Sequence, residues 1–265
     1  MRVTVDEAVI DVETAGEGSA ILMLHGFPLS REIWDAQAAA LQKTARVIRP
    51  DLRGMGRSSS SDGPYLMEAL AGDISVVLDS MQVEKVTLIG HSLGGYVALA
   101  FARMYAERVS GMVLVCSRLC ADAPEKARER EELADRIESE NSMEPALEAF
   151  LPALLAPETF SRAPEIAARV TAIIRRNDPR GAAAMLRGMA QRSGSEDIAE
   201  DLDMPVLVIG GDRDAMLPPG EIASMAKLFP RGEAQRIENS GHLSMLEQPA
   251  ALAEALALWL GSNRR

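Results

Sequence analysis

The chain has 265 residues, of which 47% are hydrophobic and 25% charged, as expected for one large α/β domain or two small ones. The formal net charge of −11 argues against binding to nucleic acid or anionic lipid, because an acidic surface repels phosphate groups. Its apolar runs are too short to span a membrane and its N-terminus lacks a signal-peptide pattern, so we expect a cytoplasmic protein without membrane association.

Cysteine and histidine are sparse. We interpret Cys116 and Cys120 as free thiols, because a disulfide at this spacing would need a tight turn and nothing else indicates an oxidising compartment. The chain has only three histidines and no Cys/His cluster. We therefore expect no metal and no other cofactor.

Eight segments have the pattern of β-strands. The first two alternate apolar and polar residues, and the others are short continuous apolar runs, which are typical of strands buried on both faces. They cover residues 2–5, 9–14, 20–25, 45–50, 85–90, 111–116, 205–210 and 234–238.

Segments with helical periodicity separate most of these strands. This alternation predicts an α/β fold with a mostly parallel eight-stranded sheet and helices on both faces. The predicted helices cover residues 30–43, 66–81, 93–106, 218–229 and 248–260.

Residues 119–200 break the alternation, because they contain helical patterns and no convincing strand. We interpret them as a helical cap inserted into a core domain formed by residues 1–118 and 201–265. The insertion could be a plain packing subdomain, a lid over a site, or both. It opens with the charged run "PEKAREREEL" at residues 124–133, which we interpret as a solvated helix face.

The sequence "GHSLGG" at residues 90–95 stands between a predicted strand and a predicted helix. Its G-x-S-x-G pattern is typical of a sharp turn that exposes a nucleophilic serine, here Ser92, at a helix N-terminus. The backbone N–H of Leu93 is then free to stabilise an oxyanion. The competing serines at residues 58–61 lie in a polar loop with no helix behind them.

Five motifs follow one another along the chain: "HGFP" (25–28), "DLRGMGRS" (51–58), "GHSLGG" (90–95), "GGDRDAMLP" (210–218) and "SGH" (240–242). In this order they resemble the α/β-hydrolases, in particular a lid-bearing group of esterases, lactonases and haloperoxidases. The resemblance implies the α/β-hydrolase fold and a Ser-His-Asp triad that needs no cofactor.

Three histidines could act as the base for Ser92. The side chain of His91 should diverge from its neighbour Ser92, and His25 is better suited to fixing the glycine loop that it opens. His242 lies in a loop between the last strand and the last helix. The resemblance places the base in this loop and therefore favours His242.

Two carboxylates, Asp212 and Asp214, follow the strand before that loop. Either would give the order Ser, Asp, His that is expected for this fold. The family's spacing relative to Pro218 favours Asp214 as the acid, which leaves Asp212 to accept backbone N–H bonds in the turn. In the segment "DLRGMGRS", the resemblance implies that Asp51 and Arg53 fix a loop.

The segment "HGFP" supplies the second oxyanion donor. Pro28 has no N–H, so the donor is Gly26 or Phe27, and the resemblance implies Phe27, together with Leu93. We assign Phe27 and Leu243 as substrate-binding residues. The scarcity of aromatic residues predicts an aliphatic pocket of modest size.

The expected activity is cleavage of small to medium carboxylic esters through an acyl-enzyme. An enol-lactonase, a C–C bond hydrolase or a cofactor-free perhydrolase could use the same triad. A small-molecule sensor on a hydrolase scaffold is the alternative of another class. Haloalkane dehalogenases and epoxide hydrolases of this fold use an aspartate nucleophile, where this chain has Ser92. The partner is therefore a small-molecule ester, and the oligomeric state is left open.

Overall fold

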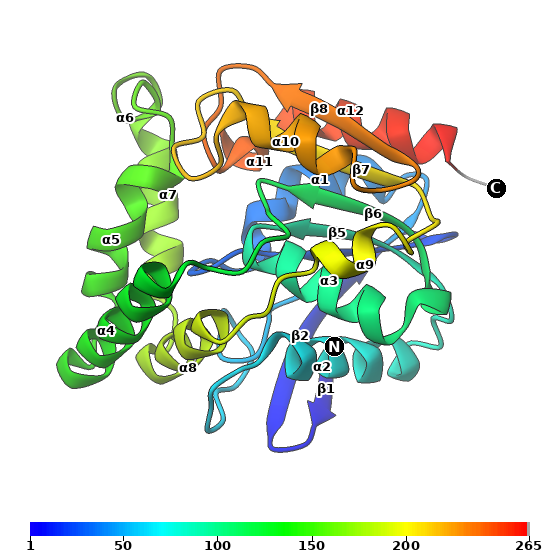
Figure 1. Cartoon of the computed structure of the whole chain (residues 1–265). Coiled ribbons are helices and arrows are strands. Elements are labelled where there is room, and N and C mark those ends of the chain that lie inside the picture. The colour runs from blue at the N-terminus through cyan, green and yellow to red at the C-terminus, as the bar shows by residue number, and fades with distance from the viewer. Residues whose placement is uncertain (264–265) are drawn as a thin grey trace.

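The computed structural model describes residues 1–263 and contains one eight-stranded sheet (Figure 1). The strand order is β1-β2-β4-β3-β5-β6-β7-β8. Only the pairs β1–β2 and β2–β4 are antiparallel, so the predicted mostly parallel sheet is confirmed. The strands are β1 Arg2–Val5, β2 Ala8–Ala15, β3 Ala20–Leu24, β4 Arg46–Pro50, β5 Val86–His91, β6 Val109–Val115, β7 Val206–Gly211 and β8 Gly232–Ile237.

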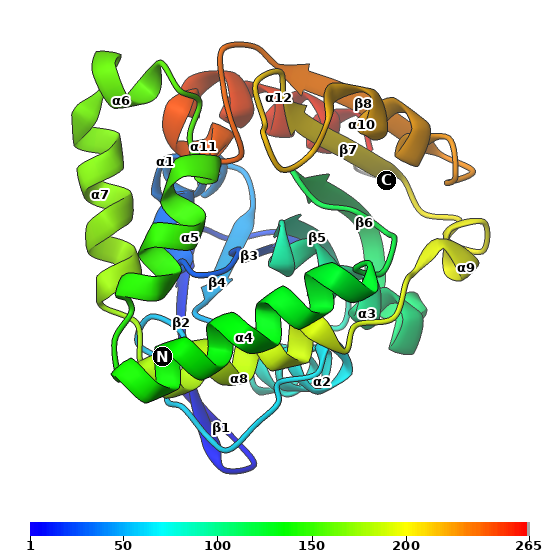
Figure 2. The ribbon, with the colours of Figure 1, turned by 60° about the vertical axis from the view of Figure 1, so that its left-hand side comes forward.

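Helices cover both faces of this sheet, where they bury the apolar side chains of the strands (Figures 1 and 2). The α1 and α12 helices pack together on one face, and α2 packs with α3 on the other. The helix predicted at residues 30–43 begins as a 3₁₀ turn, η1. The core helices are η1 Arg31–Trp34, α1 Asp35–Leu41, α2 Met67–Ser80, α3 Leu93–Met104, η2 Ala106–Arg108, α10 Pro219–Ala226, α11 Ser244–Glu247 and α12 Pro249–Ser262.

Between β6 and β7 the chain forms only helices, which we call the helical insertion (Figure 2). Proline stands in the first turn of α4, α5, α7 and α8, where its missing N–H costs no hydrogen bond. Pro152 lies inside α5 without ending it. The elements are α4 Pro124–Glu140, α5 Glu144–Leu154, α6 Thr159–Arg162, α7 Pro164–Arg175, α8 Pro179–Ala190 and α9 Glu196–Ala199.

The register of the parallel strands brings several loops to one edge of the sheet. Leu24 of β3 pairs with Gly90 of β5, which in turn pairs with Leu114 of β6. At the other side, Gly211 of β7 pairs with Ile237 of β8. The loops that follow these strands therefore emerge together, at the carboxyl edge where ligands bind in parallel α/β sheets. Among residues 1–263, no helix has both the length and the apolar character that a membrane crossing requires.

Candidate active site

Ser92 occupies a strained turn between β5 and α3. Its φ of 50° lies in the left-handed region, which costs a non-glycine residue about 1–3 kcal/mol. The turn needs glycine on both sides: a Cβ on Gly90 would collide with the backbone of Gly94, and one on Gly94 would collide with the carbonyl of Leu24. The N–H of Ser92 donates to the Val115 carbonyl at 2.9 Å, which fixes the turn to β6. The strain is thus held in place by the surrounding backbone.

Two backbone amides near this turn are available to bind a developing negative charge. Leu93 is the first residue of α3, so its N–H has no acceptor within the helix. Phe27 follows β3 at the same edge of the sheet. Within residues 1–263, neither N–H donates to another backbone group. These are the two donors that the sequence predicts for an oxyanion hole, and their role remains a prediction.

His242 and Asp214 form a buried pair. His242 Nδ1 lies 2.8 Å from Asp214 Oδ2, while Asp214 Oδ1 accepts the N–H groups of Met216 at 2.8 Å and Leu217 at 3.0 Å. Burial alone would raise the pKa of Asp214, but the nearby His242 and these hydrogen bonds outweigh it, so the pKa lies below its ordinary value of 3.8. Asp214 is therefore ionised and accepts the Nδ1 proton, which leaves His242 Nε2 unprotonated in the neutral ring.

Asp212 has a different set of contacts. Its Oδ1 accepts the N–H of Ser240 at 3.2 Å, and its own N–H donates to the Ile237 carbonyl at 3.0 Å. It therefore ties the loop after β7 to the loop that carries His242. Asp214, and not Asp212, contacts the imidazole.

His91 and His25 both support the site from within the core. His91 is fully buried, and its Nε2 donates to the His242 carbonyl at 3.0 Å. Its Nδ1 has no partner within residues 1–263, as expected of a neutral ring, and burial places its pKa well below 6.5. His25 Nε2 accepts the N–H of Leu52 at 2.9 Å, so His25 fixes the loop after β3 to the loop after β4.

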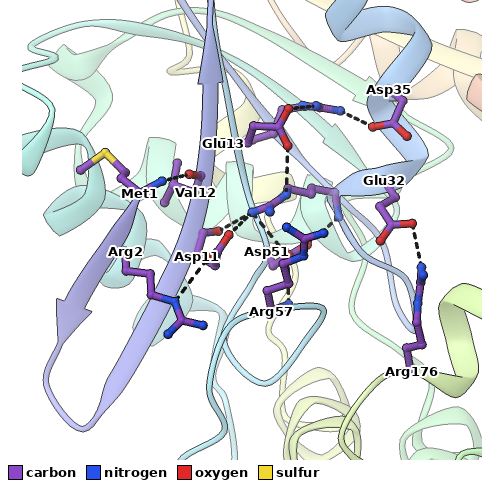
Figure 3. A network of polar contacts seen from close by, with 12 residues as sticks. Met1, Arg2, Asp11, Val12, Glu13, Glu32, Asp35, Asp51, Arg57 and Arg176 are labelled. Atoms are coloured by element: carbon purple, nitrogen blue, oxygen red, sulfur yellow. Dashed lines mark hydrogen bonds and ion pairs between the residues drawn. The ribbon is translucent and has the colours of Figure 1, made fainter.

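Asp51 and Arg53 hold the loop after β4. Asp51 accepts the N–H of Arg31 at 2.8 Å and that of Arg57 at 3.0 Å, in a network that also includes Asp11 (Figure 3). Arg53 forms a two-pronged ion pair with Asp73, with distances of 2.8 and 2.5 Å. These contacts are structural, in line with the role that the resemblance implies.

Ser92 and His242 line the same cavity, which has a volume of about 280 Å³. Phe27 packs edge-to-face on Phe150 instead, and Leu243 is fully buried; neither is among the side chains that line this cavity. The sequence predicts an aliphatic pocket, but the wall also carries charged groups that the sequence interpretation missed. The lining residues besides the pair are Tyr96, Cys116, Arg118, Asp122, Lys126, Arg130, Ala215, Met216 and Leu217.

Arg130 corrects one expectation. The charged run at residues 124–133 is interpreted from the sequence as a solvated face, and Arg128 and Glu132 are indeed exposed. Arg130, however, is only 8% exposed and pairs with Asp122 at 2.5 Å. Helical spacing places Lys126 and Arg130, four residues apart, on one face of α4, but it does not show that Asp122 covers Arg130.

Glu247 connects the helical insertion to the loop of His242. Its Oε1 accepts the N–H of Ala156 at 2.8 Å and the hydroxyl of Thr159 at 2.5 Å, and its Oε2 accepts the N–H of Gly241 at 2.8 Å. Leu243 also donates from its N–H to the Leu154 carbonyl at 3.1 Å. The end of α5 is therefore anchored on both sides of His242.

Cys116, Asp214 and His242 offer three possible ligand atoms within 4.8 Å of one another. Two of these groups are already hydrogen-bonded to each other, and burial raises the pKa of the Cys116 thiol well above its ordinary value. The thiol is therefore protonated, and the hydrogen bond between His242 and Asp214 is the contact that organises this cluster.

The model of one protein family, described as "alpha/beta hydrolase fold", matches residues 19–249. The chain belongs to this family. It is therefore a hydrolase of the alpha/beta hydrolase fold, and the fold that the motifs imply is confirmed.

Known alpha/beta hydrolases match nearly the whole chain. A thermophilic esterase from Thermogutta terrifontis, solved with malate bound, has a TM-score of 0.96 and 36% identity, covering 100% of this chain and 99% of its own. The enol-lactonase from Burkholderia xenovorans LB400 has a TM-score of 0.90 and 25% identity, covering 98% and 100%. The pimeloyl-[acyl-carrier protein] methyl ester esterase of Nitrosomonas europaea is 28% identical, covering 91% of this chain and 96% of its own.

Proposed function

We propose that this hydrolase cleaves small to medium carboxylic esters through a Ser92 acyl-enzyme. The observation that carries the proposal is the buried His242–Asp214 hydrogen bond of 2.8 Å, in a cavity that Ser92 also lines. The esterases and the enol-lactonase among the similar proteins act on esters or on lactones, which are cyclic esters. The helical insertion closes one side of the cavity, in the manner of a cap.

The proposed mechanism uses the hydrogen bond between His242 and Asp214. His242 Nε2 takes the proton of the Ser92 hydroxyl as Oγ attacks the ester carbonyl, and Asp214 stabilises the imidazolium. The Phe27 and Leu93 amides donate to the oxyanion. The C–O bond to the alcohol then breaks, and the alcohol leaves with the proton from His242. A water molecule then attacks the acyl-enzyme in the same way, with His242 as the base, which releases the acid and restores Ser92.

A panel of para-nitrophenyl esters and simple lactones tests the proposal. Ser92→Ala should lower kcat/KM by about 10⁶-fold, because the triad acts as a unit. Ser59→Ala is the matched control, because Ser59 is exposed, accepts a backbone N–H from Val9 and is not among the residues that line the cavity. A Ser92→Ala enzyme that keeps its activity would refute the nucleophile assignment.

Labelling with a fluorophosphonate separates the enzyme from a sensor on the same scaffold. The proposal requires both labelling of Ser92 and turnover of at least one ester or lactone. A protein that is labelled without turning over any member of the panel would be better explained as a ligand sensor. A rate on lactones far above that on open-chain esters would make it a lactonase with the same chemistry.

A further inference from the structure

The cavity that contains Ser92 has a positively charged wall, although the chain as a whole carries a net charge of −11. Three of its lining residues are cations: Arg118, Lys126 and Arg130. Arg118 belongs to the segment that leads into α4, and the other two stand one turn apart on that helix. Positive charge is therefore gathered at this cavity, although acidic residues outnumber basic ones in the chain.

Among residues 1–263, Asp122 is the one carboxylate in the same lining, and neighbouring cations already neutralise it. Asp122 accepts from Arg130 Nε at 2.5 Å, and its other oxygen lies 3.8 Å from a guanidinium nitrogen of Arg192. Both arginines are buried, and Arg192 also stacks on the ring of Tyr96, 3.9 Å from its centroid. Asp122 therefore serves to hold two buried cations and leaves a surplus of positive charge at this side of the cavity.

Arg118 and Lys126 are only weakly compensated. Arg118 Nη2 lies 3.6 Å from Glu221 Oε2, and Lys126 Nζ lies 2.9 Å from Glu129 Oε2. Neither glutamate lines the cavity, and their side chains are 45% and 61% exposed. Ion pairs that are this exposed contribute little, because water competes for both partners. Arg118 also donates through Nη2 to the carbonyl of Met216, another residue of the lining. Its remaining guanidinium N–H groups and the ammonium of Lys126 are available to an anion in the cavity.

We propose that this wall binds a carboxylate group carried by the ester substrate. The inference rests on the proposed ester hydrolysis and adds the substrate class: small esters with a free carboxylate on the acyl or the alcohol side. A guanidinium and an ammonium at one wall match a carboxylate in charge and hydrogen-bonding capacity. A cavity of about 280 Å³ limits such substrates to small molecules. The field of the wall also attracts anions toward Ser92 against the repulsion of the rest of the surface.

Two matched pairs of esters test this proposal and distinguish the two positions of the carboxylate. Para-nitrophenyl butyrate is compared with mono-para-nitrophenyl glutarate, which places the carboxylate on the acyl chain. Phenyl acetate is compared with para-acetoxybenzoate, which places it on the leaving group. The charge preference is the kcat/KM of the anionic ester divided by that of its neutral partner. The pair of esters whose charge preference changes in the Arg118 and Lys126 variants shows whether the wall binds a carboxylate on the acyl side or on the alcohol side.

Arg118→Gln and Lys126→Gln should each lower the charge preference by about tenfold for one of the pairs, because each removes a charge-assisted hydrogen bond. Arg128→Gln is the matched control, since it removes the same charge from the same helix at a side chain that is 71% exposed and absent from the lining. It should leave the preference within about twofold of the original. Raising the salt concentration should lower the charge preference of the unmodified protein. It should have less effect on the double variant that combines Arg118→Gln and Lys126→Gln.

Two results would overturn the proposal while ester hydrolysis stands. One is a charge preference that the double variant does not change for either pair, and the other is an equal loss in Arg128→Gln. If no ester is turned over and Ser92 is not labelled, the proposed hydrolysis fails instead. Calorimetric binding of glutarate to the unmodified protein and to the double variant still tests the wall in that case. Equal affinity for the two proteins would refute it.

Discussion

The sheet core and the helical insertion contribute to one cavity in different ways. Ser92, Asp214 and His242 stand on short turns or loops after β5, β7 and β8. Backbone hydrogen bonds connect the last two of these loops to each other and the turn of Ser92 to the end of β6. Arg118, in the segment that leads into α4, and Lys126, on α4 itself, reach the cavity through long side chains. The groups proposed to make and break bonds are therefore fixed by the backbone. The groups proposed to select the substrate are held by side-chain contacts and can be exchanged with less disturbance of the fold.

Within the core, the two aspartates that follow β7 should differ strongly in their effect on catalysis. Asp214→Asn should lower kcat by about 10⁴-fold, because an amide cannot hold the imidazole in the required tautomer or stabilise its cation. Asp212→Asn should lower kcat by less than about tenfold, because an amide oxygen can also accept the Ser240 N–H that the Asp212 carboxylate accepts at 3.2 Å. Steady-state kinetics of the two isosteric variants on one ester decides between them. A larger loss from Asp212→Asn would reverse the assignment of the acid.

A second prediction concerns a part of the insertion that is built like the core. The α8 helix packs its backbone against the loop before α2, where Tyr65 donates from its N–H to the Ala184 carbonyl at 3.1 Å. A Cβ on Gly188 would collide with the carbonyl of Tyr65. Gly188→Ala should therefore lower the free energy of unfolding by about 1–3 kcal/mol.

Gly72 in α2 offers the matched control for this substitution. A Cβ there meets nothing within 4 Å, so Gly72→Ala should stabilise the protein by about 0.5–1 kcal/mol through helix propensity. Urea denaturation of both variants measures the contrast. If Gly188→Ala were as stable as Gly72→Ala, α8 would be a movable part of a lid and not an extension of the core.

The sequence predicts the parts of the molecule whose pattern is local. Strands β3 to β7 are short apolar runs. The turn at Ser92 requires Gly90 and Gly94, because the backbone comes so close to them that a side chain would not fit. The choice of Asp214 over Asp212 came from family spacing, and only the structure shows which carboxylate contacts His242. Arg130 was misread as solvated because helical periodicity defines a face but not the neighbour that covers it. Leu243 illustrates the same limit, since sequence alone does not say which way a loop side chain points.

The last prediction contrasts the buried histidines of the core with the exposed charges of the insertion. His25 and His91 are fully buried, and burial places the pKa of each below its ordinary value of 6.5. As the pH falls below 6.5, the unfolded chain takes up these protons and the folded protein does not, so stability is present above that pH and is lost below it. Each histidine should contribute a loss of up to about 1.4 kcal/mol per pH unit.

Urea unfolding at several pH values between neutrality and pH ~5 measures this slope. His91→Gln should reduce the slope by the contribution of about one proton, because glutamine keeps a donor for the His242 carbonyl but does not titrate. Arg128→Gln, which removes an exposed charge of α4, should leave it unchanged. A slope that His91→Gln does not alter would mean that the folded protein also protonates His91 in this range. The pH dependence of stability would then arise outside the buried core. Buried and exposed ionisable groups would in that case not differ in their effect on stability.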